Sequence, residues 1–176
     1  MIIDYYKIAR AVEFYKSRGF QYVEVPWFVD RDTLDITKPK EARYFDTYLG
    51  SLVGSGEQSF LQIRNELSFR HMCVTPCFRD EPKVDEVHRN YFMKVELIDV
   101  NPTDIDKAYW DMFNLSREFF ELYEFTDVVK TTEGKDIYIN GMEVGSYGIR
   151  SFGDFHWVYG TGCAEPRLSQ AIMKGQ

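Results

Sequence analysis

A segment of charged and aromatic residues near the middle of the chain, residues 77–100, most constrains the fold. Its residue types predict two β-strands joined by a polar loop. Successive strand residues point to opposite faces, so the alternation places one set of side chains on the same face of this hairpin. The set comprises Arg79, Glu81, Phe92, Lys94 and Glu96. Because ionised groups are costly to bury unless they are paired, this face is expected to form the floor of a site for a charged ligand with a flat ring.

The remaining segments predict an α+β domain with a mainly antiparallel sheet of six to seven strands flanked by helices. Asp4 can cap a first helix that ends at Gly19, and a strand then runs from residue 20 to residue 25. Thr103 is expected to cap the longest helix, and Asn140-Gly141 is a strong hairpin signal between two later strands. The later strands are expected at residues 127–130, 137–140, 142–147 and 155–159. Residues 1–176 are expected to form a single domain.

Composition limits the kind of domain and its partners. With 176 residues, 44% of them hydrophobic, the chain can bury the core of one domain. The formal net charge of -7 argues against strong binding of nucleic acid by this domain alone. The sequence contains no long apolar run and no secretory signal pattern, which predicts a cytoplasmic protein that does not enter a membrane.

Two stretches before the hairpin admit more than one interpretation. Residues 30–45 carry many charges and a proline without a sustained period, which indicates a surface loop or a lid. In residues 52–61, two glycines flank Ser55 and the second precedes Glu57, so a ligand could approach the backbone closely. Alternatively, Ser55 simply caps a helix that begins near Glu57, with Gln58 at the capping-box position.

The C-terminal stretch, residues 159–173, combines glycines with the start of a helix. Gly160-Thr161-Gly162 is followed by Pro166, which suits the first helical turn. Arg167 in that turn would stand next to free backbone N–H groups, a combination that attracts phosphate. Taken alone, the same residues could be a tight turn with a solvated arginine.

Together these segments resemble, in order, the three signature motifs of the class II aminoacyl-tRNA synthetases. The resemblance is greatest to the subgroup that contains the seryl, threonyl, prolyl and glycyl enzymes, and it spans nearly the whole chain. Residues 19–26 are similar to motif 1, and residues 160–162 with Arg167 are similar to motif 3. Motif 2 is matched by Phe78-Arg79-Asp80-Glu81, His88, Phe92 and Lys94-Val95-Glu96-Leu97. Two further parallels to the seryl enzymes are Ser55-Gly56-Glu57 and the pair of Glu143 and Ser146.

The resemblance implies that ATP is bound and that Arg79 and Arg167 are the catalytic residues. Arg79 would bridge the α-phosphate of ATP and the carboxylate of an amino acid, which places both for in-line attack. Phe92 would stack under the adenine, with Glu81 beside its amino group, and His88 and Arg167 would hold the γ-phosphate. The implied ATP-binding residues are Arg79, Glu81, His88, Phe92, Gly160, Gly162 and Arg167.

The resemblance also implies Mg²⁺, held through oxygen atoms of Glu143 and Ser146. In an ideal strand these two side chains point to opposite faces, so Gly145 would have to relax the geometry. The implied substrate-binding residues are Ser55, Glu57 and Glu96, with the two glutamates reading the amino group and the side chain of the substrate.

These matches predict an enzyme that forms an aminoacyl-adenylate from ATP and an amino acid and transfers the aminoacyl group to tRNA or another acceptor. Two alternatives remain open: a relative that activates another carboxylic acid or loads a carrier protein, and a non-catalytic module for binding or dimerisation. The first helix carries more aromatic residues than one buried face needs, which predicts a homodimer formed through residues 5–26. Because no part of the chain is left for a separate tRNA-binding domain, its binding to tRNA is expected to be weak.

Overall fold

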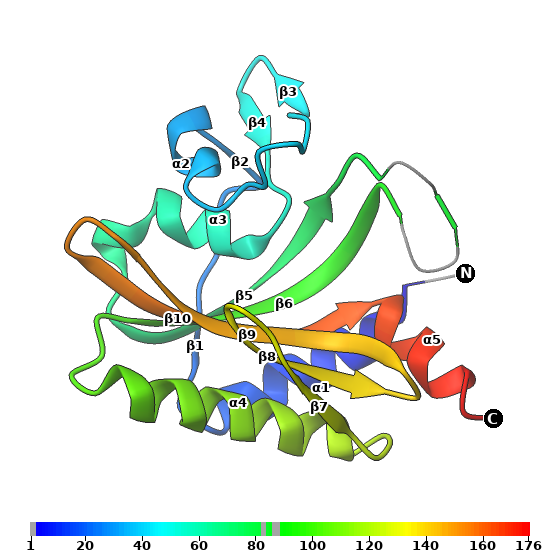
Figure 1. Cartoon of the computed structure of the whole chain (residues 1–176). Coiled ribbons are helices and arrows are strands. Elements are labelled where there is room, and N and C mark those ends of the chain that lie inside the picture. Colours follow the sequence, from blue (N-terminus) through cyan, green and yellow to red (C-terminus); the bar gives the residue numbers. More distant parts are fainter. Residues whose placement is uncertain (1–2, 82–83, 86–88) are drawn as a thin grey trace.

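The structure, a computed structural model, describes residues 3–81, 84–85 and 89–176. Within these residues, seven strands form one sheet, in which β1 runs parallel to β5 and the other neighbouring strands are antiparallel. In spatial order the strands are β1 (Gln21–Tyr22), β5 (Phe69–Phe78), β6 (Tyr91–Val100), β10 (Phe155–Glu165), β9 (Met142–Phe152), β8 (Gly134–Ile139) and β7 (Asp127–Lys130). The predicted α+β class with a mainly antiparallel sheet is confirmed (Figure 1).

Helices cover both faces of this sheet (Figure 1). They are α1 (Tyr5–Lys16), α2 (Arg31–Asp35), α3 (Gly56–Gln62), α4 (Ile105–Glu121) and α5 (Arg167–Met173), with a short 3₁₀ helix at Arg64–Glu66. The apolar sides of α1, α4 and α5 pack on one face and form the larger core with the sheet. On the opposite face, Phe60 and Leu61 of α3 pack with Trp157 of β10 in a second core. Among the described residues, no helix is both long and apolar enough to cross a membrane.

A second, smaller sheet stands on the α3 side of the molecule (Figure 1). In the described part of the chain, its strands are β2 (Phe28–Val29), β4 (Gly50–Leu52) and β3 (Asp46–Thr47), in that spatial order. Val29, Leu34 and Val53 pack together in a small core of their own. The stretch expected to be a loop or lid, residues 30–45, therefore contains α2 and is anchored by apolar contacts.

Two local sequence signals are confirmed by the backbone. The side chain of Asp4 caps α1 by accepting hydrogen bonds from two backbone N–H groups of the first turn, and Gly19 lies just beyond the helix with a φ of 90°. Asn140 and Gly141 have φ values of 50° and 73°, which suit the predicted tight hairpin between β8 and β9.

The predicted cap of the longest helix is wrong by one residue. Asp104, rather than Thr103, precedes α4, and its carboxylate accepts a hydrogen bond from the backbone N–H of Lys107 at 2.9 Å. A carboxylate at this position also interacts favourably with the positive end of the helix dipole.

Several strands differ in length from the prediction. The strand expected over residues 20–25 is reduced to the two residues of β1 at the edge of the sheet. In contrast, β9 and β10 continue past residues 147 and 159 to Phe152 and Glu165. Residues 160–162 therefore lie inside a strand and do not form a turn.

Candidate active site

Two adjoining cavities are formed on the face of the sheet that carries α3. The larger cavity has a volume of about 600 Å³ and lies between α3, residues 37–43 and the turn between β7 and β8. The smaller cavity, of about 270 Å³, lies between β6, β9 and the start of α5. The residues that line both cavities are Arg79, Glu81, Lys94 and Ser146. Most of the predicted site residues that the structure describes therefore gather around these two cavities.

The floor where the cavities meet is formed by β6, as the alternation predicted, and by the residues that follow β5. Arg79 and Glu81 were expected on the first strand but lie beyond its end at Phe78. Phe92 lines the smaller cavity, Glu96 lines the larger one, and Lys94 between them lines both. Arg79 directly follows β5, and its Nε donates a hydrogen bond to the carbonyl of Gly54 at 3.2 Å. Its guanidinium carbon lies 5.0 Å from the centroid of the Phe92 ring. A cation and an aromatic ring are thus placed side by side at the junction.

Cationic side chains stand around the smaller cavity. Arg167 lines it and lies 3.6 Å from Glu143, measured between Nη1 and Oε1. Arg89, which the sequence analysis did not assign, lines the same cavity. The predicted phosphate ligand His88 lies outside the described residues. The described arginines supply positive charge suited to a polyphosphate.

A β-bulge brings the two predicted metal ligands to the same cavity. In the pairing of β8 with β9, Ile137 pairs with Gly145 and Tyr138 pairs with Glu143, so Val144 is an extra residue. One extra residue reverses the alternation, and Glu143 and Ser146 consequently both line the smaller cavity. The irregularity that the sequence analysis placed at Gly145 is thus located one residue earlier.

The two predicted ATP-binding glycines have a packing role in this structure. A Cβ on Gly160 would lie 2.6 Å from the ring of Tyr147 and 2.8 Å from the sulfur of Met112 in α4. A Cβ on Gly162 would lie 2.9 Å from Tyr15 of α1. Both positions therefore face the helices on the far side of the sheet, and Thr161 between them lines the smaller cavity. The implied binding of ATP at Gly160 and Gly162 is a separate question, because the cramped space lies on the side of the strand that faces the helices.

The start of α5 also differs from the expectation of free N–H groups. The backbone N–H of Ser169 donates to Oε1 of Glu165 at 3.1 Å, and the Ser169 hydroxyl hydrogen-bonds to the same carboxylate. Glu165 is fully buried, and α5 has only seven residues. The start of α5 is therefore partly occupied by Glu165, and the guanidinium of Arg167 is the positive group that this helix presents to the smaller cavity.

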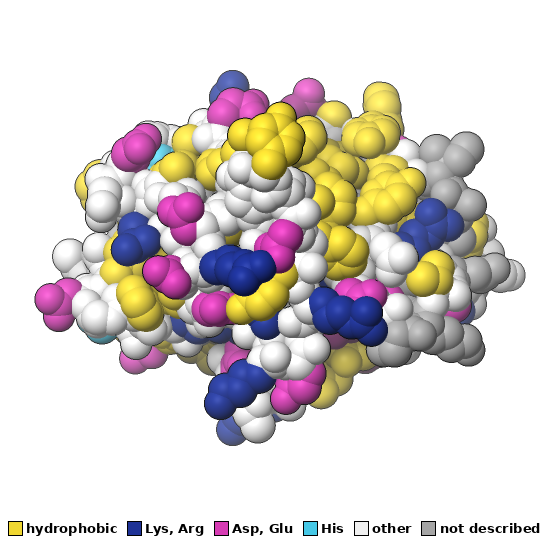
Figure 2. All heavy atoms as spheres, turned by 90° about the horizontal axis from the view of Figure 1, so that it is seen from above, with side chains coloured by type: hydrophobic (Ala, Val, Ile, Leu, Met, Phe, Trp, Pro, Cys, Tyr) yellow, Lys and Arg dark blue, Asp and Glu magenta, His cyan; other side chains and the backbone are white. Residues whose placement is uncertain are grey.

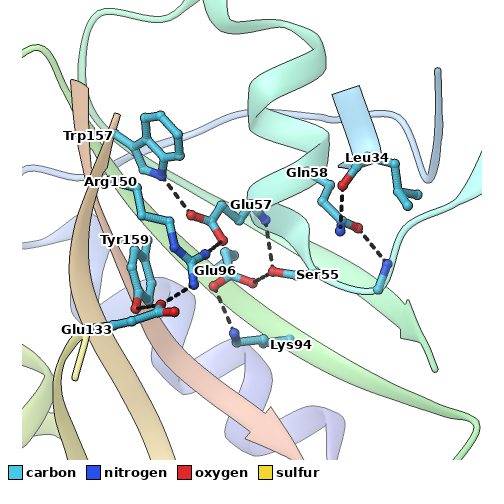
Figure 3. A network of polar contacts seen from close by, with 11 residues as sticks. Leu34, Ser55, Glu57, Gln58, Lys94, Glu96, Glu133, Arg150, Trp157 and Tyr159 are labelled. Carbon is cyan, nitrogen blue, oxygen red and sulfur yellow. Dashed lines mark hydrogen bonds and ion pairs between the residues drawn. The ribbon is translucent and has the colours of Figure 1, made fainter. Parts of the chain in front are cut away.

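The wall of the larger cavity holds a network around a buried carboxyl group (Figure 3). Oε1 of Glu57 accepts a hydrogen bond from the indole N–H of Trp157 at 2.7 Å, and Oε2 lies 2.5 Å from Nη1 of Arg150. Glu57 is only 4% exposed. Burial raises the pKa of this carboxyl to about 7, although the charge of Arg150 acts in the opposite direction.

Arg150 is the main member of this network that the sequence analysis missed. Its other terminal nitrogen, Nη2, lies 2.5 Å from Oε2 of Glu133, and its guanidinium carbon lies 4.2 Å from the centroid of the Tyr159 ring. The Tyr159 hydroxyl donates to the same Glu133 oxygen at 3.1 Å. A signal was present, because continuing the alternation of β9 from Ser146 by two steps of two residues reaches Arg150. Because the predicted strand ended at residue 147, Arg150 was not assigned to its face.

A second polar chain lies next to the first (Figure 3). Oε1 of Glu96 lies 2.8 Å from Nζ of Lys94, and Oε2 accepts a hydrogen bond from the hydroxyl of Ser55 at 2.8 Å. Ser55 also caps α3, because its hydroxyl accepts a hydrogen bond from the backbone N–H of Glu57 at 3.2 Å. The interpretation of Ser55 as a helix cap is confirmed, and the same residue lines the larger cavity.

Asp136 is a further carboxylate of the larger cavity, on β8 opposite Ser146 of β9. It is 9% exposed, and its Oδ1 has no hydrogen-bond partner among the described residues. Burial raises the pKa of this carboxyl, a hydrogen bond with Ser146 lowers it, and the charges of Glu143 and Glu133 raise it.

Comparisons with known proteins place this architecture among synthetases. No protein-family model matches the sequence, and no curated protein matches it significantly. A solved pyrrolysyl-tRNA synthetase of Desulfitobacterium hafniense is 18% identical, with a TM-score of 0.72 over 97% of this chain and 67% of that one. A seryl-tRNA synthetase of Pyrococcus horikoshii, solved with ATP, is 19% identical, with a TM-score of 0.77 over 96% of this chain and 49% of that one. A cytoplasmic serine-tRNA ligase of Naegleria fowleri, solved with AMP, is 14% identical, with a TM-score of 0.69 over 93% of this chain and 46% of that one.

At these identities the similarity establishes the fold. The chain has the fold of the class II synthetase catalytic domains, as its sequence motifs predicted. It spans about half of the two seryl enzymes and 67% of the pyrrolysyl enzyme.

Proposed function

We propose that this domain activates an amino acid by forming an aminoacyl-adenylate from ATP. The observation that carries the proposal is the arrangement of two adjoining cavities that share Arg79, one beside an aromatic ring and further arginines, the other lined by paired carboxylates. A reaction between ATP and a carboxylate requires both reactants to be held next to each other and next to one cation. The fold shared with synthetases supports the same conclusion.

The smaller cavity suits the nucleotide. Phe92 offers a flat face for adenine, and Glu81 lines the cavity near it. Arg167 and Arg89 offer positive charge to the β- and γ-phosphates. Gly160 and Gly162 act by leaving room for the packing of β10 against the helices.

The donor atoms of Glu143 and Ser146 fit Mg²⁺. One carboxylate and one hydroxyl converge on the same cavity because of the bulge at Val144, and oxygen atoms of this kind are the ligands that Mg²⁺ prefers. When bound, the ion would neutralise charge on the phosphates. Glu143 is 3.6 Å from Arg167, so this carboxylate is already oriented by a cation of the phosphate site.

Arg79 is assigned the central role in the reaction. Its guanidinium would hold a carboxylate oxygen of the substrate and an oxygen of the α-phosphate at the same time. The other carboxylate oxygen attacks the α-phosphorus, a new P–O bond forms, and the bond from that phosphorus to the bridging oxygen breaks to release pyrophosphate. Donors aimed at the charge that develops on the phosphorus oxygens lower the barrier to this step. Hydrogen bonding of Arg79 to Gly54 at 3.2 Å positions the side chain beforehand.

The acceptor of the activated group is proposed to be tRNA or another acceptor, bound weakly by this domain. Here 21 basic residues face 28 acidic ones. On the face shown in Figure 2, the described Lys and Arg side chains lie among Asp and Glu side chains. Strong binding of nucleic acid requires several phosphate contacts from a basic surface. A carrier protein is the alternative acceptor.

A homodimer through residues 5–26 remains part of the proposal, but fewer aromatic residues are available for the interface than the sequence suggested. Tyr15 is fully buried, and Phe14 packs against Tyr15 and Phe119 within the chain. Tyr5, Tyr6 and Tyr22 are 61%, 78% and 42% exposed, so these three tyrosines are available for a contact with a second copy. Light scattering at micromolar concentration should report twice the mass of one chain.

The test of the proposed function is ATP–pyrophosphate exchange with each of the twenty amino acids. At least one amino acid should support exchange, and Arg79→Ala should reduce the rate on the order of 10²-fold or more. Arg117→Ala is the matched control, because Arg117 forms an exposed ion pair with Glu121 on α4 and its loss should change the rate by less than about twofold. Exchange that is unaffected by Arg79→Ala would remove Arg79 from the reaction.

A further inference from the structure

The two glutamates expected to read the substrate are already engaged. Glu57 is bound by Trp157 at 2.7 Å and by Arg150 at 2.5 Å, one partner for each oxygen. Glu96 is bound by Lys94 and by Ser55, each at 2.8 Å, again one partner for each oxygen. Exposure of the two residues is 4% and 1%. Both oxygens of each glutamate therefore already have a donor, and the carboxylates expose almost no surface to a substrate amine.

Asp136 differs from the two glutamates, because it has a hydrogen bond with Ser146 but one of its oxygens lacks a donor. It lines the larger cavity, is 9% exposed, and its Oδ1 has no hydrogen-bond partner among the residues that the structure describes. Most buried polar atoms in folded proteins are hydrogen-bonded, and leaving a charged oxygen without a donor is costly. A buried carboxylate oxygen that lacks a donor and borders a cavity is suited to a donor that arrives with the ligand.

Among the residues that the structure describes, the cations near this cavity are directed elsewhere. Arg150 is held between Glu57 and Glu133, each at 2.5 Å. Lys135, the sequence neighbour of Asp136, lies on the other side of the sheet, with Nζ 4.6 Å from the centroid of the Trp110 ring of α4. The positive partner for Asp136 is therefore expected from the ligand.

We propose that Asp136 binds the ammonium group of the substrate whose carboxylate is held by Arg79. The inference rests on the proposed function and specifies its substrate side. Arg79 and Asp136 both line the larger cavity, so this cavity offers a cation for the carboxylate and a carboxylate for the ammonium of one zwitterion. The Glu57–Arg150 and Glu96–Lys94 ion pairs then form the wall of the cavity, and Asp136 is the carboxylate that pairs with the ammonium. Asp136 is thus a substrate-binding residue that selects acids with an amine.

The test is isothermal titration of each of the twenty amino acids into the full chain saturated with Mg²⁺ and α,β-methylene-ATP, a nucleotide that cannot form an adenylate. The amino acid that binds is compared with its 2-hydroxy acid, which lacks the ammonium. For the wild type, the 2-hydroxy acid should bind on the order of 10-fold or more weaker, the usual effect of losing a hydrogen bond to a charged group. Asp136→Asn should weaken the amino acid by the same factor and leave the 2-hydroxy acid unchanged.

Controls separate the possible roles of the residue. Glu57→Gln keeps the shape of the wall and should leave the preference for the amine intact. Asp136→Ser, a smaller replacement, should act like Asp136→Asn, and unchanged binding of the nucleotide analogue shows that either variant is folded.

Four results would overturn the inference. First, the preference for the amine could persist in Asp136→Asn. Second, the preference could be lost in Glu57→Gln, which would show that Glu57 binds the ammonium. Asp136→Asn could instead weaken the Mg²⁺-nucleotide analogue, which would make Asp136 a metal ligand. If the wild type binds the nucleotide analogue but no amino acid, the proposed amino acid activation fails together with the role of Asp136. The other results concern Asp136 alone and leave the proposed activation in place.

Discussion

Replacing Arg150 by leucine should destabilise the protein in a way that depends on pH. Arg150 is paired with the buried carboxyl of Glu57 at 2.5 Å, with side-chain exposures of 29% and 6%. Removing one partner of a buried ion pair costs about 3–5 kcal/mol, and because part of Arg150 reaches solvent we expect the lower value, about 3 kcal/mol, at pH 8.5. For a chain of this length the loss corresponds to a fall in Tm of roughly 6–12 °C.

The pH dependence follows from the raised pKa of Glu57. The pKa is about 7 in the folded chain against an ordinary 4.5, so between these values the folded state holds a proton that the unfolded state has released. Stability therefore falls as the pH rises through this window, by roughly 3 kcal/mol for a shift of this size. Without Arg150 the folded pKa rises further, and the fall continues above pH 7. At pH 5.5 Glu57 is protonated in both proteins, and only about 1 kcal/mol of packing on Tyr159 is lost.

The assay is urea unfolding followed by tryptophan fluorescence at pH 5.5 and pH 8.5, with wild type, Arg150→Leu, Glu57→Gln and the double variant. The cost of Arg150→Leu should be several times larger at the higher pH, and this difference should vanish in the Glu57→Gln background. Equal costs at both pH values would refute the argument, because they would show that the charge of Glu57 does not determine the stability of this network.

Three further predictions concern the nucleotide site, the packing of β10 and the acceptor. Phe92→Ala should weaken Mg-ATP on the order of tenfold or more in isothermal titration, since a stacked base contributes about 1–3 kcal/mol; unchanged affinity would remove Phe92 from the adenine site. Gly162→Ala should lower the free energy of unfolding by about 1–3 kcal/mol, because the added Cβ would lie 2.9 Å from Tyr15 and from Val95; a neutral effect in urea unfolding would contradict the close packing. Filter binding in moderate salt should give a Kd for tRNA above about 1 µM, and a lower Kd would show that the domain has a basic surface for nucleic acid.

The sequence predicted the fold, and most of the residues that it named for the site line the two cavities, because the strand alternation and a set of ordered motifs agree. Alternation along β6 placed Phe92, Lys94 and Glu96 on one face, and the structure brings them to the two cavities. The Asn140-Gly141 hairpin followed from local backbone preferences. Such features depend on neighbouring residues in the chain, and for that reason a sequence can show them.

The features that the sequence did not show depend on tertiary contacts. The bulge at Val144 is an irregularity of pairing between two strands and has no sequence signature of its own. Gly160 and Gly162 suggest a loop when they are taken alone, yet Tyr147 and Tyr15 pack against them from distant elements. Likewise, the engagement of Glu57 by Trp157 joins residues 100 positions apart. Only the folded chain shows which carboxylates are paired and which, like Asp136, have an oxygen without a partner.

The central claim is that Arg79 joins a nucleotide cavity to an acid cavity, so that ATP is cleaved between its α- and β-phosphates. The most direct measurement is a single turnover of [α-³²P]ATP with excess protein, Mg²⁺ and the amino acid that supports exchange, followed by separation of the labelled products. The account predicts a labelled aminoacyl-adenylate that stays with the protein and yields AMP on hydrolysis, formed by the wild type and not by Arg79→Ala. Labelled ADP as the product, or an adenylate formed equally well without Arg79, would contradict it.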